Sequence, residues 1–187
     1  MSSEYKYVHE KKKHPKPTKT QEDLNAEKGI FNFTEINGFK LKQVEWTVPD
    51  QQTRKRRRSG FDKVRKAFLQ ELGTNHVKEL IELGLTDAQI KQVKAGKNPL
   101  GYNVHHKHPI HGGGQNVFEN LILMPIKPHD ELHHKVMDPQ VKNMQTGDSK
   151  KVWIPWSDDM VYHDPEKSRT IMNLKTASLL LKNAKAR

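Results

Sequence analysis

The sequence contains no cysteine among its 187 residues. Disulfide bonds and thiolate metal sites are therefore excluded, so a bound metal ion must have histidine, carboxylate or backbone oxygen ligands. The chain also lacks any run of eighteen or more apolar residues, and its N-terminal stretch has no apolar segment of the kind found in secretory signals. We therefore expect neither a membrane-spanning helix nor a cleavable signal peptide.

Acidic residues are the minority among the charged side chains. The chain has 33 lysines and arginines against 22 aspartates and glutamates, which gives a formal net charge of +11 at pH 7. A positive surplus of this size predicts an anionic partner, such as a nucleic acid or a membrane surface. Composition alone does not choose between these two partners.

The densest positive charge lies in the stretch RKRRR, which comprises Arg54, Lys55, Arg56, Arg57 and Arg58. A solvated charge run or a localisation signal would have the same composition. We favour contact with a nucleic-acid backbone, because several basic side chains together supply sequence-independent affinity through counterion release.

The spacing of apolar and turn residues predicts an α+β fold with one domain, residues 28–187, preceded by a basic, disordered tail, residues 1–27. Apolar and polar residues alternate around Asn37 and Gly38, which predicts a hairpin of two short strands between residues 28 and 48. Helices are expected from after Ser59 to Gly73, from 75 to 83, from 86 to 96 (opened by a capping box of Thr86 and Gln89) and from 168 to 182.

Seven of the eleven histidines lie in one stretch, YNVHHKHPIHGGGQNVFENLILMPIKPHDELHHK. It predicts a strand, a glycine-rich turn, a second strand and a helix that starts near Pro128 and stops at Asp138 and Pro139. His129 and His133, four residues apart on that helix, can reach a single metal ion. His105 and His106 are neighbours on a strand and point to opposite sides, so we expect them to have different tasks.

This stretch resembles the HNH, or ββα-metal, endonuclease motif, and especially the nuclease domains of bacterial polymorphic toxins and DNase bacteriocins. The resemblance covers roughly residues 86–135. It implies a ββα-metal core at residues 100–137, made of a two-stranded hairpin and a helix, with additional helices and the short N-terminal hairpin around it.

The resemblance also assigns roles to particular residues. His105, His129 and His133 become the ligands of one divalent metal ion, which would be zinc, nickel, magnesium or manganese. The implied catalytic residues are His106, the general base that activates water, and Asn120, which braces the loop and so orients that base. His134 is expected to be a bystander or a phosphate contact, and His108 and His111 are assigned no function.

The function implied by the resemblance is metal-dependent, largely nonspecific hydrolysis of phosphodiester bonds in DNA, as the toxic domain of an interbacterial effector. Its partners would be DNA, a cognate immunity protein and a secretion-system component that delivers it from the bacterial cytoplasm into a target cell. Lys107 and Lys135, with Lys127, are further candidates for phosphate contacts.

Other functions remain open at this point. An HNH nuclease could instead process phage or mobile-element DNA, or cut RNA. A non-catalytic, metal-stabilised nucleic-acid-binding module would bind DNA with a steep salt dependence and never cut it. A purely structural metal site would leave His106 without a role.

Overall fold

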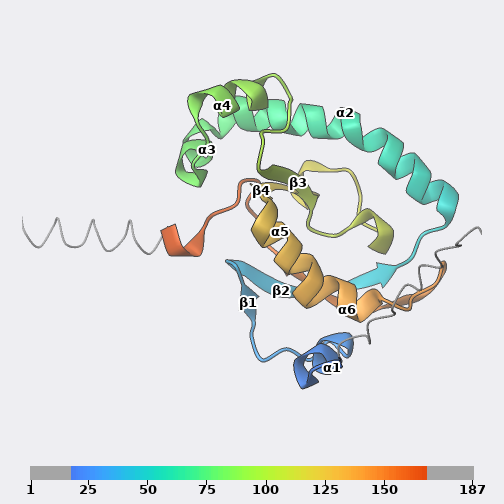
Figure 1. The fold of residues 1–187 in the computed structure, drawn as a ribbon. Helices are drawn as coiled ribbons and strands as arrows, with labels where there is room; N and C mark the ends of the chain where they lie inside the picture. Colours follow the sequence, from blue (N-terminus) through green and yellow to red (C-terminus); the bar gives the residue numbers. More distant parts are fainter. Residues whose placement is uncertain (1–17, 168–187) are drawn as a thin grey trace, which may run out of the picture.

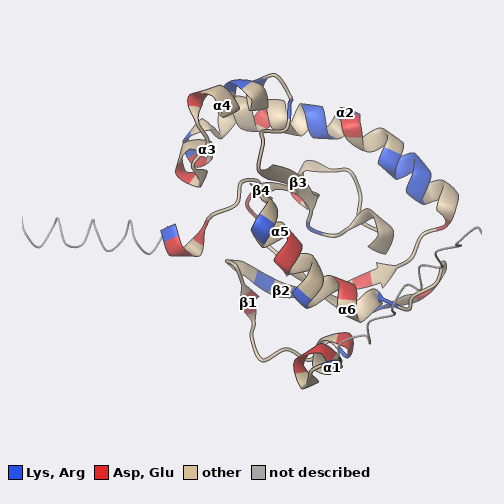
Figure 2. Cartoon of the chain, in the orientation of Figure 1, with Lys and Arg blue, Asp and Glu red and all other residues tan. Residues whose placement is uncertain are grey.

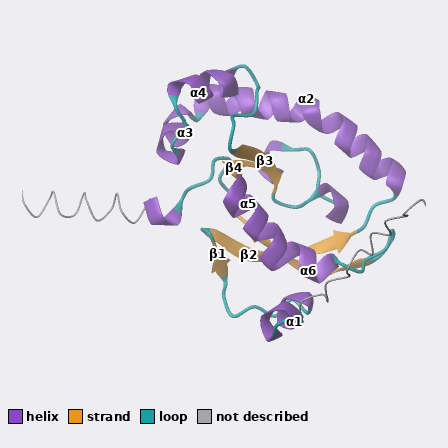
Figure 3. Ribbon diagram, viewed as in Figure 1, coloured by secondary structure: helices purple, strands orange, loops and turns teal. Residues whose placement is uncertain are grey.

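A computed structural model describes residues 18–167, and these form an α+β fold with two small antiparallel sheets (Figures 1 and 3). The elements follow in the order α1 (Gln21–Glu27), β1 (Glu35–Ile36), β2 (Phe39–Thr47), α2 (Gln51–Asn75), α3 (Val77–Leu83), α4 (Asp87–Lys94), β3 (Tyr102–His106), η1 (Ile110–Gly112), η2 (Phe118–Asn120), β4 (Leu121–Pro125), α5 (Ile126–Leu132), η3 (His133–Met137), α6 (Asp138–Val141) and β5 (Ser149–Trp156). The predicted α+β class is confirmed.

The larger sheet has the strand order β1-β2-β5. The predicted hairpin is confirmed, because Asn37 and Gly38 have positive φ angles of 50° and 80°, the backbone that a tight two-residue turn requires. Strand β5 pairs antiparallel with β2, from Lys40 opposite Trp156 to Thr47 opposite Ser149. This pairing joins segments more than a hundred residues apart.

The smaller sheet consists of β3 and β4, the two strands predicted in the histidine-rich stretch. They pair antiparallel from Tyr102 opposite Pro125 to His106 opposite Leu121. The first four residues of β4 are buried, and its Leu123 also forms a bridge with Val161. The apolar run of β4 thus places the histidine-bearing strand β3 against the core of the domain.

The helix after β4 is longer than predicted. Helix α5 continues through the π-helical turn η3 into α6, so Asp138 and Pro139 do not stop it. Proline is tolerated there because Pro139 lies in the first turn of α6 and the wide π-turn precedes it. Figure 1 shows α5 and α6 following one another in front of β2.

Helix α2 corrects the prediction at both ends. It begins at Gln51, where the Asp50 side chain accepts a hydrogen bond from the Thr53 amide, rather than after Ser59. It also continues through Gly73, where an added Cβ would lie 2.7 Å from backbone atoms of Lys94. Gly73 is therefore a point of close packing between α2 and α4, and not a helix stop.

Helices α3 and α4 form a short pair against the C-terminal half of α2 (Figure 1). The stop at Gly84, with φ of 102°, and the capping box of Thr86 and Gln89 are confirmed. On α3, Leu80 and Leu83 are buried, whereas Ile81 is 57% exposed. Ile81 therefore lies outside the core, because residues 80 and 83 share the buried face of this helix.

The predicted disordered tail is also corrected in part. Residues 21–27 form α1, which Thr20 and Asp23 open with a reciprocal capping box, so this segment belongs to the folded chain. The rest of the predicted tail, up to residue 17, and the predicted helix at 168–182 lie outside the described residues. No helix in the described part of the chain is long and apolar enough to cross a membrane.

Candidate metal centre and the depression around it

Three histidines from β3 and the following helix meet at one point. The centroid of the His105 ring lies 4.9 Å from that of His129 and 5.2 Å from that of His133. The centroids of the two helical rings are 4.8 Å apart. One nitrogen from each ring lies within 4.8 Å of the other two. The three residues predicted as metal ligands are therefore together, in a group that could hold a metal ion.

The donor atoms of these histidines suit a metal. His105 is 3% exposed, and its Nε2 is buried without a hydrogen-bond partner among residues 18–167, which is costly unless a ligand completes the site. Nδ1 of His129 lies 2.9 Å from Asp130 Oδ1, and Nδ1 of His133 lies 3.4 Å from Asp138 Oδ1. A carboxylate at Nδ1 fixes the ring and leaves Nε2 to bind a metal.

The surroundings of His105 and His133 also favour the uncharged form of each imidazole. Burial, followed by the nearby His133 and His129, holds the pKa of His105 well below its ordinary value. Burial and the neighbouring His129 likewise lower the pKa of His133. Both imidazoles are therefore neutral at pH 7, which is the form that binds a metal ion.

His106 lies on the other side of β3, as strand alternation predicts. Its ring packs 4.3 Å from the ring of Phe61 on α2, and its Nε2 lies 2.8 Å from Oδ1 of Asn116. The Asn116 amide nitrogen donates to the Arg57 carbonyl at 2.7 Å, which turns the amide oxygen toward His106. His106 Nε2 therefore carries the proton, and Nδ1 keeps the lone pair that a general base requires.

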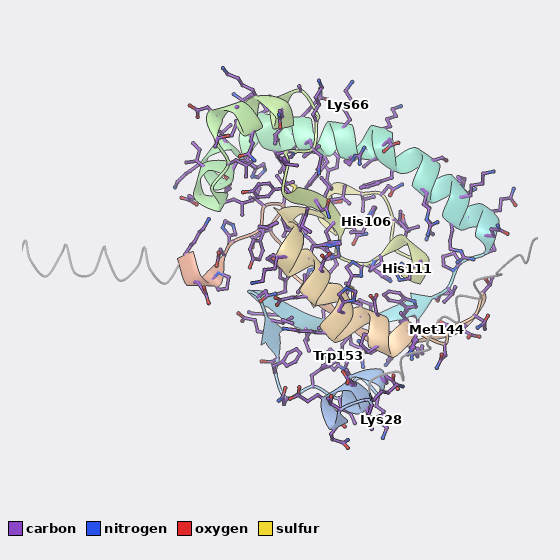
Figure 4. The ribbon with its side chains drawn as sticks, viewed as in Figure 1. Lys28, Lys66, His106, His111, Met144 and Trp153 are labelled. Carbon is purple, nitrogen blue, oxygen red and sulfur yellow. The ribbon has the colours of Figure 1, made fainter. Side chains whose placement is uncertain are left out.

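His105 and His106, which lie on opposite sides of β3, both line one shallow depression at the end of this strand. It has a volume of about 200 Å³ and is lined by Arg58, Val104, His105, His106, Pro109, Ile110, His111, His129 and His133. Figure 4 shows His106 and His111 between α2 and the helix formed by α5 and α6. Burial lowers the pKa of His106 as well, so its imidazole is neutral at pH 7.

The loop between β3 and β4 is braced by Asn120. The Asn120 side chain accepts from the His108 amide at 2.8 Å and donates to the carbonyls of His108 and Gln115, both at 2.9 Å. Gly114 packs so closely on the His108 carbonyl that a Cβ there would collide with it. No hydrogen bond joins Asn120 to His106 within the described residues, so Asn120 acts on that histidine only through the loop.

Asn116 is a site residue that the sequence did not single out, and His111, which was assigned no function, also lies at the site. Asn116 bonds to a carbonyl on α2, 59 positions earlier, and no local pattern reports such a contact. His111 packs edge-on against Trp46, with ring centroids 4.9 Å apart, and lines the depression. His108, by contrast, has its Nε2 2.8 Å from the Gly112 carbonyl and has a structural place, as expected.

Two lysines that were predicted to contact phosphate differ in position. Lys107 is fully buried, with its Nζ donating to the Glu119 carbonyl at 2.9 Å and 5.2 Å from the Trp156 ring centroid. The phosphate contact predicted for Lys107 is therefore wrong, because a nucleic acid cannot reach this amine in the folded chain. Lys135 is exposed and pairs with Glu131 at 3.4 Å.

The basic run on α2 does not act as one unit, although Figure 2 shows its residues close together near the start of the helix. Arg54 bonds to Thr146 at 3.5 Å, and Arg57 donates to the Gly114 carbonyl at 3.2 Å. Arg58 lines the depression, whereas Lys55 and Arg56 are exposed on the helix. Only part of the predicted nucleic-acid contact therefore lies beside the histidines.

Comparison with known proteins assigns no family. No model of a known protein family and no solved structure matches the chain. The chain is 35% identical over 102 residues to the uncharacterized protein YhhZ of Escherichia coli (strain K12), a match that covers 54% of the chain and 24% of YhhZ. The chain therefore spans about a quarter of the length of this relative, whose name states no activity.

Proposed function

We propose that the chain is a metal-dependent, largely nonspecific DNA endonuclease of the HNH class. The observation that carries this proposal is that one depression holds two kinds of histidine: three that could hold a metal ion and a fourth, His106, whose Nδ1 has no hydrogen-bond partner in the described part of the chain. The order of β3, β4 and α5 around these residues agrees with a ββα-metal core, in which hairpin and helix share the metal.

In this proposal His105, His129 and His133 hold the ion, which would supply Lewis-acid stabilisation of the charge that develops on the phosphoryl oxygens. His106 Nδ1 takes the proton from the water that attacks phosphorus, while the bond from phosphorus to the leaving oxygen breaks and that oxygen takes a proton from bulk water. Arg58 contacts a non-bridging phosphate oxygen from the α2 side. Asn116 keeps the His106 ring in the orientation and tautomer that this transfer requires.

The biological setting is a further proposal and rests on the resemblance to toxin nucleases. A nuclease of that kind would need a cognate immunity protein in the cell that makes it and a delivery component that takes it into a target cell. The net charge of +11 agrees with a nucleic-acid substrate, because lysines and arginines release counterions from phosphates.

The test is to incubate the purified protein with supercoiled plasmid and with structured RNA, in EDTA and with magnesium, manganese, nickel or zinc. We expect plasmid cleavage that requires a divalent ion and is absent in the His105→Ala variant. Cleavage that persists in EDTA, or binding without cleavage under every metal, would contradict the proposal. If the protein cleaves only RNA, the proposed mechanism stands and the substrate is RNA instead of DNA.

A further inference from the structure

One face of α2 runs past the depression and carries two arginines. Arg58 and Arg65 are seven residues apart and so differ by only about 20° around a regular α-helix. Phe61 lies between them, about 60° from Arg58 on the side of the depression. We call these three residues the Arg58 face of α2.

Contacts connect this face to His106. Arg58 lines the depression together with the metal-site histidines. Phe61 packs 4.3 Å from the ring of His106, and the Arg65 guanidinium lies 5.7 Å from the centroid of the Phe61 ring. A second guanidinium is therefore placed beside the aromatic wall of the general base, outside the basic run at residues 54–58.

Two other basic residues of this part of α2 are not placed in this way. Arg56 and Lys63 lie about 160° and 140° around the helix from Arg58, on its opposite side. Both are exposed. They carry the same charge as the Arg58 face, on the same helix, but they point away from the histidines.

We propose that the Arg58 face of α2 holds the phosphate backbone of the substrate strand as it passes His106, and that Arg65 is a binding residue of the site. Seven residues of helix rise about 10 Å, which corresponds to roughly three phosphates along one strand of a duplex. Two guanidiniums at this separation can contact two phosphates of one strand that lie a few nucleotides apart. That the phosphates belong to the strand being cut rests on the proposed nuclease function.

Asp62 opposes this binding, so a substitution of Asp62 provides a second test of the proposal. It lies between the two arginines, about 40° from Arg58, and its Oδ1 pairs with Arg65 at 2.9 Å. The Asp62 side chain is 79% exposed, so the ion pair is weak and a phosphate can displace it. Removing this carboxylate should therefore strengthen binding to a nucleic acid.

The experiment compares two double variants that lose equal charge from the same helix, Arg58→Ala with Arg65→Ala, and Arg56→Ala with Lys63→Ala. Each is titrated with a fluorescent DNA duplex in EDTA over a range of salt concentrations, after thermal unfolding has shown equal stability. For the first variant we expect affinity to fall at least tenfold, and the slope of log affinity against log salt to lose about 0.9 for each phosphate contact. The second variant should lose less than threefold.

Equal losses in the two double variants, or no duplex binding by the wild-type chain, would overturn the proposal. Asp62→Asn should bind the duplex more tightly, and weaker or unchanged binding would count against it as well. These measurements need neither metal nor cleavage. If the protein binds DNA through the Arg58 face but never cuts it, the proposed binding surface therefore stands and the proposed nuclease function is wrong.

Discussion

The two sides of β3 hold neighbouring histidines by different means. On one side His105 meets His129 and His133, which follow it within 28 residues and come from the helix directly after the hairpin. On the other side His106 lies against Phe61 and Asn116, and Asn116 is tied to the carbonyl of Arg57 on α2. One side is therefore built within a single local motif, whereas the other depends on a distant helix.

In the proposed nuclease, this difference separates metal binding from proton transfer. The His105 side presents three buried or half-buried nitrogens to one point, which is suited to hold an ion. The His106 side presents one imidazole whose proton and orientation are set by a hydrogen bond, which suits it to move a proton. Changes on the first side should affect metal affinity, and changes on the second side should affect only turnover.

The largest expected effect is at the helical ligand. His133→Ala should abolish metal-dependent stabilisation, whereas His134→Ala should retain it, because the His134 side chain is 78% exposed and is not one of the three histidines of the group. A metal at about a hundred times its Kd stabilises by about 2.7 kcal/mol, so the wild type and His134→Ala should gain several degrees in Tm. Thermal unfolding with and without nickel or zinc measures this. If the metal still stabilises His133→Ala, the assignment of His133 as a metal ligand is wrong.

The next effect sharpens the assignment of the other side. Asn116→Ala should lower kcat by roughly 10- to 100-fold with little change in KM or in metal affinity, because His106 loses the partner that orients it. The neighbouring Gln115→Ala is the control, since the Gln115 side chain is exposed and forms no hydrogen bond with the described residues, and alanine keeps the carbonyl that accepts from Asn120. An equal loss of activity in both variants, or a loss of metal affinity in Asn116→Ala, would indicate a general disturbance of the loop.

How well the sequence predicts the molecule follows the same division. The metal side was predictable, because the spacing of His129 and His133 and the alternation along β3 are local patterns, and the resemblance to the HNH motif chose His105 over His106 as the third ligand. The role of α2 was not, because Asp50 starts this helix nine residues before the predicted start and Gly73 does not end it. The pairing of β2 with β5 was not predicted either, since no periodicity reports which distant strands meet.

Lys107 shows the same limit at a single residue. Its charge and its place beside His106 favoured a phosphate contact, but the side chain is buried under Trp156. Asn120 shows the opposite case. Its bracing of the loop was predicted from the motif, and its three hydrogen bonds to loop backbone agree with that role. What the motif does not contain is Asn116, whose side chain forms a hydrogen bond with His106.

Two glycines of α2 test the helix that forms the wall of the His106 side. Gly73→Ala should destabilise the fold by about 1–3 kcal/mol, because its Cβ would lie 2.7 Å from the Lys94 backbone. Gly60→Ala should instead stabilise it by up to about 1 kcal/mol, because a Cβ at that position makes only an ordinary contact, 3.7 Å from Asn116, and alanine favours the helix. Urea unfolding measures both. The same sign for both variants would contradict the packing described for α2.

The smallest expected effect concerns Lys107. Burial lowers its pKa to about 8 from 10.5, so between pH 8 and 10.5 the unfolded chain binds more protons than the folded chain. The contribution of Lys107 to stability therefore rises as pH rises through this window. Lys107→Met should lose this rise, relative to the wild type, in urea unfolding at pH 8 and 9.5. The affinity of Lys107→Met for DNA should be unchanged. A fall in that affinity would indicate that Lys107 contacts phosphate after all.

The most direct measurement of the division between the two sides of β3 is a calorimetric titration of His106→Ala with nickel or zinc, together with a plasmid cleavage assay on the same preparation. We predict wild-type metal affinity and at least a hundredfold loss of cleavage, because the three ligands remain and only the base is removed. Cleavage near the wild-type rate, or a loss of metal binding equal to that of His105→Ala, would contradict the account.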